Sequence, residues 1–277
     1  MSTKKVWFIT GASKGLGLSL VKKLLQEGHQ LAATSRTAEA LTAAVGTTSS
    51  DFLPLQVDLL SESSIATAVQ ETIATFGRVD VVVNNAGYGI GGTLEELENS
   101  EIMQSFEVNV FATMNVIRAI VPQLRSQRSG HIINIASIAG FAAATGWAVY
   151  AATKFAVVGL SEVLAEDLAE FGIHVTVVEP GAFRTNFLTP DSLSLPANPI
   201  ADYTTVRASH ARYLTMDGTQ AGDPDKAATA FIELANLEQP PVRLFLGSDA
   251  YKRATQKVVL IQQGLEEWKT TSESTDF

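Results

Sequence analysis

The chain contains no cysteine among its 277 residues. It therefore cannot form a disulfide, a zinc–thiolate or iron–sulfur site, or use a thiol nucleophile. Histidine is also scarce: the four copies, at positions 29, 131, 174 and 210, are scattered without the spacing of metal ligands. The sequence predicts no metal centre.

Positive charge is in short supply as well, with 20 Lys and Arg residues against 29 Asp and Glu, a formal net charge of −9. This balance argues against nucleic acid or an anionic membrane surface as the main partner. The apolar run Val6–Ile9 near the N-terminus stops at Gly11 and is too short for a secretory signal. We therefore expect an intracellular, cytoplasmic protein.

One long stretch lacks charge altogether. Residues 129–153 contain no Asp, Glu, Lys or Arg, a length that could cross a bilayer. The stretch nevertheless includes His131, Asn134, Ser137 and three glycines, and it resembles a strand, a loop and the start of a helix. A membrane span should be a continuous apolar helix, so we predict no membrane span here.

Short apolar runs alternate with longer amphipathic segments, a pattern typical of parallel strands that are covered on both faces. The predicted strands are Val6–Ile9, Leu31–Thr34, Leu53–Val57, Val81–Val83, His131–Ile135, Val175–Val178 and Leu244–Leu246. The predicted helices are Leu16–Gln26, Ser61–Phe76, Asn99–Leu124 and Val149–Phe171. Right-handed connections then favour one α/β domain over 1–277, a Rossmann-type doubly wound parallel sheet of about seven strands with helices on both faces.

Two segments interrupt this rhythm. Residues 186–222 are rich in Pro, Ser, Thr and Asp, and a loop of that length in a compact domain is usually functional, so we predict a lid over a substrate. Residues 249–277 have apolar side chains at near-helical spacing, which predicts a C-terminal helical extension and tail.

The first candidate site is the segment TGASKGLG at 10–17, between a predicted strand and a predicted helix. Gly11, Gly15 and Gly17 would permit a tight turn and a close approach to a pyrophosphate, whose charge the helix N-terminus would favour. Glycines at such a junction can also be simple turn residues. The position of the loop in the first strand–helix unit favours nucleotide binding.

The end of the second strand bears on which nucleotide binds. A carboxylate there would bind the ribose 2′-hydroxyl of NAD, whereas this chain has Ser35 and Arg36. The forked guanidinium of Arg36 suits a 2′-phosphate, and Lys14 could add a second positive charge. Both cations could instead be ordinary solvated side chains. With no acidic residue present, we predict NADP(H) in preference to NAD(H).

Polar groups also follow the third and fourth strands. The carboxylate of Asp58 could accept a hydrogen bond from an adenine amino group, or could merely cap the next helix, for which Ser61 is better placed. The segment NNAG at 84–87 would form a cofactor wall at the carboxyl edge of the sheet, or a simple turn.

Tyr150 and Lys154 stand four residues apart on one face of a predicted helix. A free phenol has a pKa near 10, and a nearby ammonium would lower it, making Tyr150 a usable general acid or base. Ser137, at the end of the fifth strand, could hydrogen-bond the same reacting oxygen. The Tyr–Lys spacing can also arise by chance in a chain with five tyrosines.

These motifs, in this order, resemble the short-chain dehydrogenase/reductase family over nearly the whole chain. They are TGASKGLG at 10–17, NNAG at 84–87, Asn109 in EVNVFA, Ser137 in IASIAG, YAATK at 150–154 and PGAFRT at 180–185. The resemblance implies a catalytic tetrad of Asn109, Ser137, Tyr150 and Lys154. In the family the tyrosine exchanges a proton with the carbonyl oxygen, the serine polarises that oxygen, the lysine binds the nicotinamide ribose and lowers the pKa of the tyrosine, and the asparagine holds a proton-relay water.

The predicted cofactor site extends across all the strand ends. It comprises Gly11, Ser13, Lys14, Gly15, Leu16, Gly17, Ser35, Arg36, Asp58, Leu59, Asn85, Ala86, Gly87, Tyr150, Lys154, Pro180, Gly181, Phe183 and Thr185. By resemblance, Thr185 and the backbone near Gly181 and Phe183 position the nicotinamide amide.

Substrate contacts are predicted for Tyr88, Ala139, Trp147 and Phe187, with Phe141 and Tyr203 as further aromatic candidates. They favour a hydrophobic ketone or aldehyde as the small-molecule substrate, although Arg207 or Arg212 could serve a charged substrate. The expected enzyme is an NADPH-dependent carbonyl reductase. An NAD-linked alcohol or hydroxysteroid dehydrogenase and a non-catalytic nucleotide-binding regulator are the alternatives.

The C-terminal extension departs from many tetrameric members of the family, whose last strand ends differently. A helix covering the last strand, Leu244–Leu246, would block one of the usual subunit contacts. We therefore expect a homodimer or a monomer.

Overall fold

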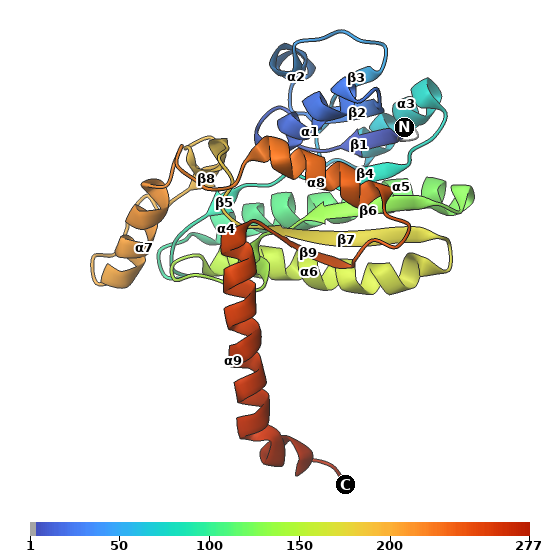
Figure 1. Ribbon diagram of the computed structural model, residues 1–277. Helices are drawn as coiled ribbons and strands as arrows, with labels where there is room; N and C mark the ends of the chain where they lie inside the picture. Colours follow the sequence, from blue (N-terminus) through green and yellow to red (C-terminus); the bar gives the residue numbers. More distant parts are fainter. Residues whose placement is uncertain (1–3) are drawn as a thin grey trace.

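The computed structural model describes residues 4–277, and its centre is a single seven-stranded parallel sheet (Figure 1). The strand order is β3-β2-β1-β4-β6-β7-β9, and the predicted Rossmann-type fold is confirmed. The strands are β1 (Val6–Ile9), β2 (Gln30–Ser35), β3 (Phe52–Gln56), β4 (Val81–Asn84), β6 (Gly130–Ile135), β7 (Ile173–Pro180) and β9 (Arg243–Leu246).

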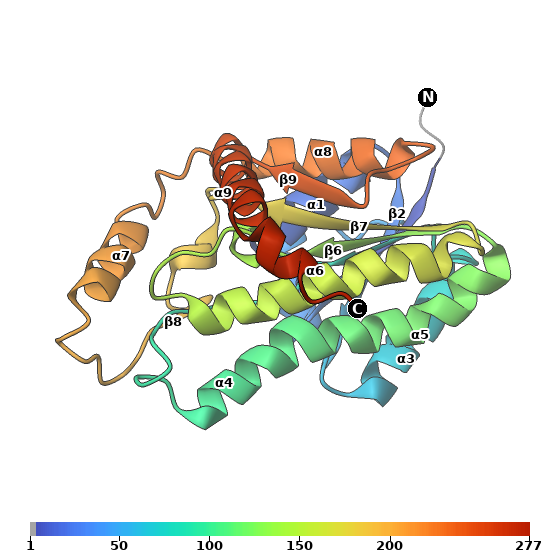
Figure 2. The same cartoon turned by 90° about the horizontal axis from the view of Figure 1, so that it is seen from below.

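Helices cover both faces of the sheet (Figures 1 and 2). On one face lie α1 (Gly15–Gln26), α2 (Ala38–Val45) and α8 (Pro224–Asn236), and on the other lie α3 (Glu62–Phe76), α5 (Ala112–Gln127) and α6 (Ala148–Ala169). The central strand shows why its sequence is apolar throughout. Trp7 and Ile9 point into the first core, whereas Phe8 points into the second, because successive side chains of a strand alternate between faces.

The predicted helix over 99–124 is instead three consecutive segments. α4 (Asn99–Phe106) and α5 are joined by a π-helical turn, Glu107–Phe111. A π-turn adds a residue to the helical repeat and re-aims the side chains within it. Here it carries Asn109, whose position is described below.

Helix α6 is long and apolar enough to cross a membrane by length and composition. Its inner face is occupied, however. Val157 and Val158 pack with Val177 of β7 in a buried cluster, and Leu168 belongs to the second core. These contacts are those of a core helix in a doubly wound sheet.

Residues 186–222, here called the overhang, connect β7 to α8. The overhang contains a short 3₁₀ turn (Asn186–Leu188), strand β8 (Leu193–Ser194) and helix α7 (Thr204–Leu214). β8 pairs with β5 (Gly89–Ile90) in a second, two-stranded sheet, which fastens the overhang to the loop after β4.

The C-terminal extension forms the last helix, α9 (Ser248–Glu273). The first turns of α9 pack beside β9, where Ala250 and Ala254 share an apolar cluster with Phe245. The rest of the helix projects away from the body (Figure 1).

Candidate active site

A cavity of about 1000 Å³ opens at the carboxyl ends of the strands. It lies where the strand order reverses between β1 and β4, and the helices α1 and α5 that follow these two strands cover opposite faces. Such a switch point leaves a crevice in doubly wound sheets. Loops after six of the seven strands line the cavity, as do residues from the overhang and α9.

The glycine loop and the NNAG turn form one hydrogen-bonded unit. The side chain of Asn85 donates to the carbonyl oxygens of Thr10 (3.1 Å) and Gly11 (2.9 Å), and the amides of Asn85 and Ala86 both donate to Oγ1 of Thr10. Gly11 has a φ of +64°, and a Cβ there would lie 2.7 Å from Cα of Ala86. Neither segment is therefore a free-standing turn.

Gly17 does not line the cavity, in contrast to the prediction. A Cβ at this position would lie 2.6 Å from the Asn85 side chain and 2.7 Å from the carbonyl oxygen of Gly11. Because Gly17 has no side chain, the glycine loop and the NNAG turn can lie in contact. Gly17 thus supports the wall of the cavity without lining it.

The start of α1 faces the cavity without a capping side chain. Lys14 occupies the N-cap position and provides no side-chain cap, while Gly15 and Leu16 line the cavity. Uncapped amides and the helix dipole favour an anion at this place. Nζ of Lys14 donates instead to the carbonyl oxygen of Asp191 in the overhang, at 3.0 Å.

The ends of β2 and β3 form the far side of the cavity. Ser35, Arg36, Asp58 and Leu59 all line it, and Arg36 is exposed. Asp58 accepts a hydrogen bond from the amide of Leu60 at 2.9 Å, whereas Ser61 caps α3. The cavity wall here carries a guanidinium at the end of β2, where an NAD-binding unit has a carboxylate.

Tyr150, Lys154 and Ser137 meet at the opposite end. Tyr150 stands in the first turn of α6, and Nζ of Lys154 lies 5.7 Å from the centre of its ring. Nζ donates to the carbonyl oxygen of Ile135 at 3.1 Å, which fixes the lysine below the tyrosine. Ser137 follows β6 and lines the cavity as Tyr150 does, and its hydroxyl accepts a hydrogen bond from the amide of Ala139 at 3.1 Å.

The pKa values of this pair differ from expectation. Burial raises the pKa of Tyr150 to about 12, and the hydrogen bond from Ser137 only partly opposes that rise. Burial also lowers the pKa of Lys154 to about 8. The predicted lowering of the pKa of Tyr150 is therefore not found, because desolvation disfavours the charged phenolate. At neutral pH the phenol holds its proton.

Asn109 does not line the cavity either. It is 1% exposed, and its amide group pairs with the backbone of Tyr88, accepting from the nitrogen at 2.9 Å and donating to the oxygen at 3.0 Å. It also lies 3.3 Å from the hydroxyl of Thr153. Asn109 therefore lies behind the cavity wall, where it connects the backbone of Tyr88 to Thr153 of α6.

The four predicted substrate contacts, Tyr88, Ala139, Trp147 and Phe187, all line the cavity. The two further aromatic candidates do not. Phe141 packs against Phe245 of β9 with ring centres 5.3 Å apart, and the hydroxyl of Tyr203 donates to Glu95 at 2.7 Å.

The overhang is fixed to the body by Glu96. This buried carboxylate accepts from the amide of Ile200 at 2.8 Å and pairs with the guanidinium of Arg207 at 2.6 Å. Burial raises its pKa, but hydrogen bonds from Thr93 and Ile200, together with Arg207, hold the pKa below its usual range. Arg207 is thus unavailable to a substrate, whereas Arg212 lines the cavity.

Several cavity residues have no counterpart in the sequence motifs. They are Tyr213, Met216 and Gln220 from the overhang, and Asp249 and Arg253 from α9. Gln220 is 2% exposed, and neither atom of its side-chain amide has a hydrogen-bond partner within the described part of the chain. For the three overhang residues, the only sequence signal was the prediction that 186–222 covers a substrate. No sequence signal indicated the two residues of α9.

The uncapped amides at the start of α1, the guanidinium of Arg36 and the volume of about 1000 Å³ fit a dinucleotide. A Cβ at Gly87 would lie 2.9 Å from Oδ1 of Asn109, so this wall of the cavity requires glycine at position 87, as it does at position 11. Within residues 4–277, no cluster of three or more His, Asp and Glu side chains could hold a metal ion.

Comparison with known proteins identifies relatives across the whole chain. Residues 5–194 match the family model described as short chain dehydrogenase. The chain is 34% identical to oxidoreductase BOA17 of Botryotinia fuckeliana over 269 residues, covering 97% of this chain and 98% of the relative. It is 33% identical over 243 residues to 3-ketodihydrosphingosine reductase of Bacteroides thetaiotaomicron, covering 88% of each.

Solved structures agree with this. A short-chain dehydrogenase from Streptomyces avermitilis superposes with a TM-score of 0.91 at 35% identity, covering both chains completely. A 3-ketoacyl-(acyl-carrier-protein) reductase from Brucella melitensis, solved with NADH, gives a TM-score of 0.74 at 25% identity over 88% of this chain and 97% of that one.

Proposed function

Since the chain belongs to the short-chain dehydrogenase family and is an oxidoreductase, we propose that it reduces a hydrophobic ketone or aldehyde to the alcohol with NADPH. The observation that carries the proposal is a buried phenol, Tyr150, in the wall of the cavity, with the ammonium nitrogen of Lys154 5.7 Å from the centre of its ring. A protonated phenol can donate to a carbonyl oxygen as that oxygen gains charge.

The choice of cofactor rests on Arg36. Its exposed guanidinium at the end of β2 would pair with a 2′-phosphate through two parallel hydrogen bonds. The first turn of α1 would hold the pyrophosphate, and Thr185 and the backbone of Phe183 would hold the nicotinamide end.

A bound nicotinamide would supply a hydride to the carbonyl carbon. Tyr150 would give its proton to the carbonyl oxygen, which becomes the alcohol, while Ser137 would hold that oxygen in line. The ammonium of Lys154 would stabilise the phenolate that remains, because an opposite charge at this distance favours the ionised form. Asn109 is a positioning residue that fixes the opposite wall.

The substrate class follows from the lining. Tyr88, Ala139, Trp147 and Phe187 give the space beside Tyr150 an apolar and aromatic surface, with ring centres of Tyr150 and Phe187 5.9 Å apart. A carbonyl compound with an extended apolar part would fill it. The relative named as a 3-ketodihydrosphingosine reductase supports a ketone.

The test is NADPH oxidation with a panel of aliphatic, aromatic and steroidal carbonyls, using wild type, Tyr150→Phe and Tyr203→Phe. General acid catalysis contributes about 10²–10⁴-fold, so Tyr150→Phe should lose turnover by that factor and still bind NADPH. Tyr203→Phe removes a hydroxyl outside the cavity and should retain turnover. Absence of oxidation across the panel, or wild-type turnover in Tyr150→Phe, would contradict the proposal.

A further inference from the structure

Helix α9 exposes a row of large apolar side chains along its projecting part. Tyr251, Val258, Ile261, Leu265 and Trp268 are all exposed. Ala254, which packs on the body, lies on the same line, and with it these residues recur at alternating intervals of three and four from 251 to 268. We call the five exposed residues the seam. A repeat of 3.5 residues keeps side chains on one line of a helix and is typical of coiled-coil contacts between helices.

The projecting part of α9 is a weak helix by composition. Val258, Val259 and Ile261 are β-branched, and Gly264 follows within three residues. Both residue types have lower helix propensity than the straight-chain residues. A helix of this kind gains most of its stability from packing of its apolar side. The body of the chain supplies such packing only at Ala250 and Ala254.

The two halves of α9 and the residues after it carry opposite charge. Residues 250–263 include the exposed Lys252 and Lys257 and no acidic residue, whereas Arg253 in the same half lines the cavity and donates to the carbonyl oxygen of Ala142. Residues 264–277 include four acidic residues and only one basic residue, Lys269. Two such helices side by side in the same direction would place like charges together. In the opposite direction each basic half would lie beside an acidic half, within the range over which charges interact in physiological salt.

We propose that α9 pairs through its seam with α9 of a second copy of this chain, in antiparallel orientation about a two-fold axis. An isologous contact of this kind lets one surface serve both partners. The seam supplies the apolar layer, and the opposite charge of the two halves selects the direction.

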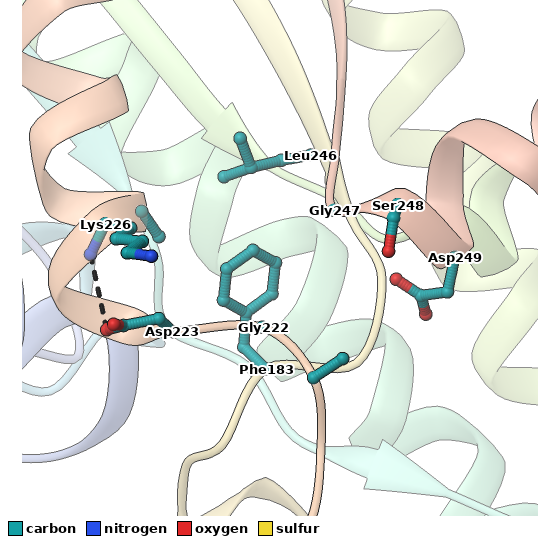
Figure 3. A pocket seen from close by; sticks show the side chains of 10 residues that line it. Phe183, Gly222, Asp223, Lys226, Leu246, Gly247, Ser248 and Asp249 are labelled. Atoms are coloured by element: carbon teal, nitrogen blue, oxygen red, sulfur yellow. Dashed lines mark hydrogen bonds between the residues drawn. The ribbon is translucent and has the colours of Figure 1, made fainter.

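The first turn of α9 connects the proposed helix pair to the cavity. Figure 3 shows Ser248 and Asp249 beside Gly247 and Phe183, in a smaller cavity of about 220 Å³. Asp249 accepts a hydrogen bond from the amide of Ala182 at 2.9 Å, and a Cβ at Gly181 would collide with the carboxylate. The helix that pairs is thus held by the same loop that lines the cofactor end.

The test compares two leucines of the same helix. Leu265 in the seam is 68% exposed, and Leu260, on another side of the helix, is 63% exposed. Leu265→Glu should halve the mass of the wild-type assembly in light scattering, because it places a charge in the apolar layer. Leu260→Glu introduces the same charge and should leave that mass unchanged. NADPH binding and the circular dichroism of each variant check that the body is folded.

A wild type that stays at 29.5 kDa at every concentration would overturn the proposal, as would an assembly that survives Leu265→Glu or is also lost in Leu260→Glu. A monomer that co-sediments with phosphatidylcholine–phosphatidylserine vesicles would assign the seam to lipid and likewise overturn it.

The orientation has its own test, because the chain lacks cysteine. Thr255→Cys and Lys269→Cys flank the seam at its two ends. An antiparallel pair should give a disulfide between the two variants when they are mixed and oxidised. A disulfide of Thr255→Cys with itself would overturn the antiparallel arrangement.

Discussion

The sheet edge and the overhang enclose the same cavity but are built differently. At the sheet edge the backbone itself is in close contact: Gly11 lies against the backbone of Ala86, and Gly87 lies against the side-chain amide of Asn109. The overhang is held by side chains, chiefly the pair of Glu96 with Arg207, and by the two-residue strand β8. The difference teaches that Gly11 and Gly87 are fixed by close contact, whereas Gly218 in the overhang has open space where a Cβ would lie.

A pair of glycine substitutions, one at the sheet edge and one in the overhang, tests this comparison most directly. Gly11 and Gly218 both have left-handed backbone, with φ of +64° and +77°, but a Cβ meets Ala86 at Gly11 and nothing within 4 Å at Gly218. Gly218→Ala should cost about 1 kcal/mol of stability through backbone strain alone. Gly11→Ala should cost roughly 3 kcal/mol or more, because overpacking adds to that strain.

Urea unfolding of both variants measures the difference in stability, and NADPH titration shows whether the proposed cofactor site is intact. We expect weakened NADPH binding only in Gly11→Ala. Equal losses of stability in the two variants would show that the two sides are constrained alike.

The second prediction concerns the electrostatics of the sheet edge. Arg36→Asp replaces a guanidinium with a carboxylate that repels a 2′-phosphate and suits a ribose hydroxyl. The ratio of kcat/KM with NADPH to that with NADH should fall about 100-fold, which corresponds to about 2.7 kcal/mol. Arg125→Asp, with the same charge change in the last turn of α5, is the control. An unchanged ratio in Arg36→Asp would contradict the assignment of NADPH.

The same contrast explains what could be predicted from the sequence. The strand pattern and the motifs at Gly11, Asn85, Ser137 and Tyr150 belong to the edge, where local backbone geometry and position along the sheet determine the arrangement. Rossmann topology therefore followed from periodicity, and all four predicted substrate contacts line the cavity.

The remainder depends on contacts between distant segments. No local pattern distinguishes Arg207, which pairs with Glu96 more than a hundred residues away, from Arg212, which lines the cavity. The pKa of Tyr150 is raised chiefly by burial, and a spacing of four residues between Tyr150 and Lys154 specifies nothing about burial. The direction of α9 could not be predicted either, because helical periodicity says nothing about where a helix points.

The smallest expected effect lies in the overhang, at Gln220. Its buried amide faces the cavity without a partner within residues 4–277, so it can hydrogen-bond a bound molecule. Gln220→Leu keeps the approximate volume but removes that bond, which is worth about 1 kcal/mol, so KM for the carbonyl substrate or for NADPH should rise about fivefold. Stability in urea should stay the same or increase, since an unsatisfied buried amide is replaced by an apolar group. Gln70→Leu, on the exposed side of α3, controls for the added apolar surface. A fall in stability with both KM values unchanged would mean that Gln220 supports the fold of the overhang and does not read a ligand.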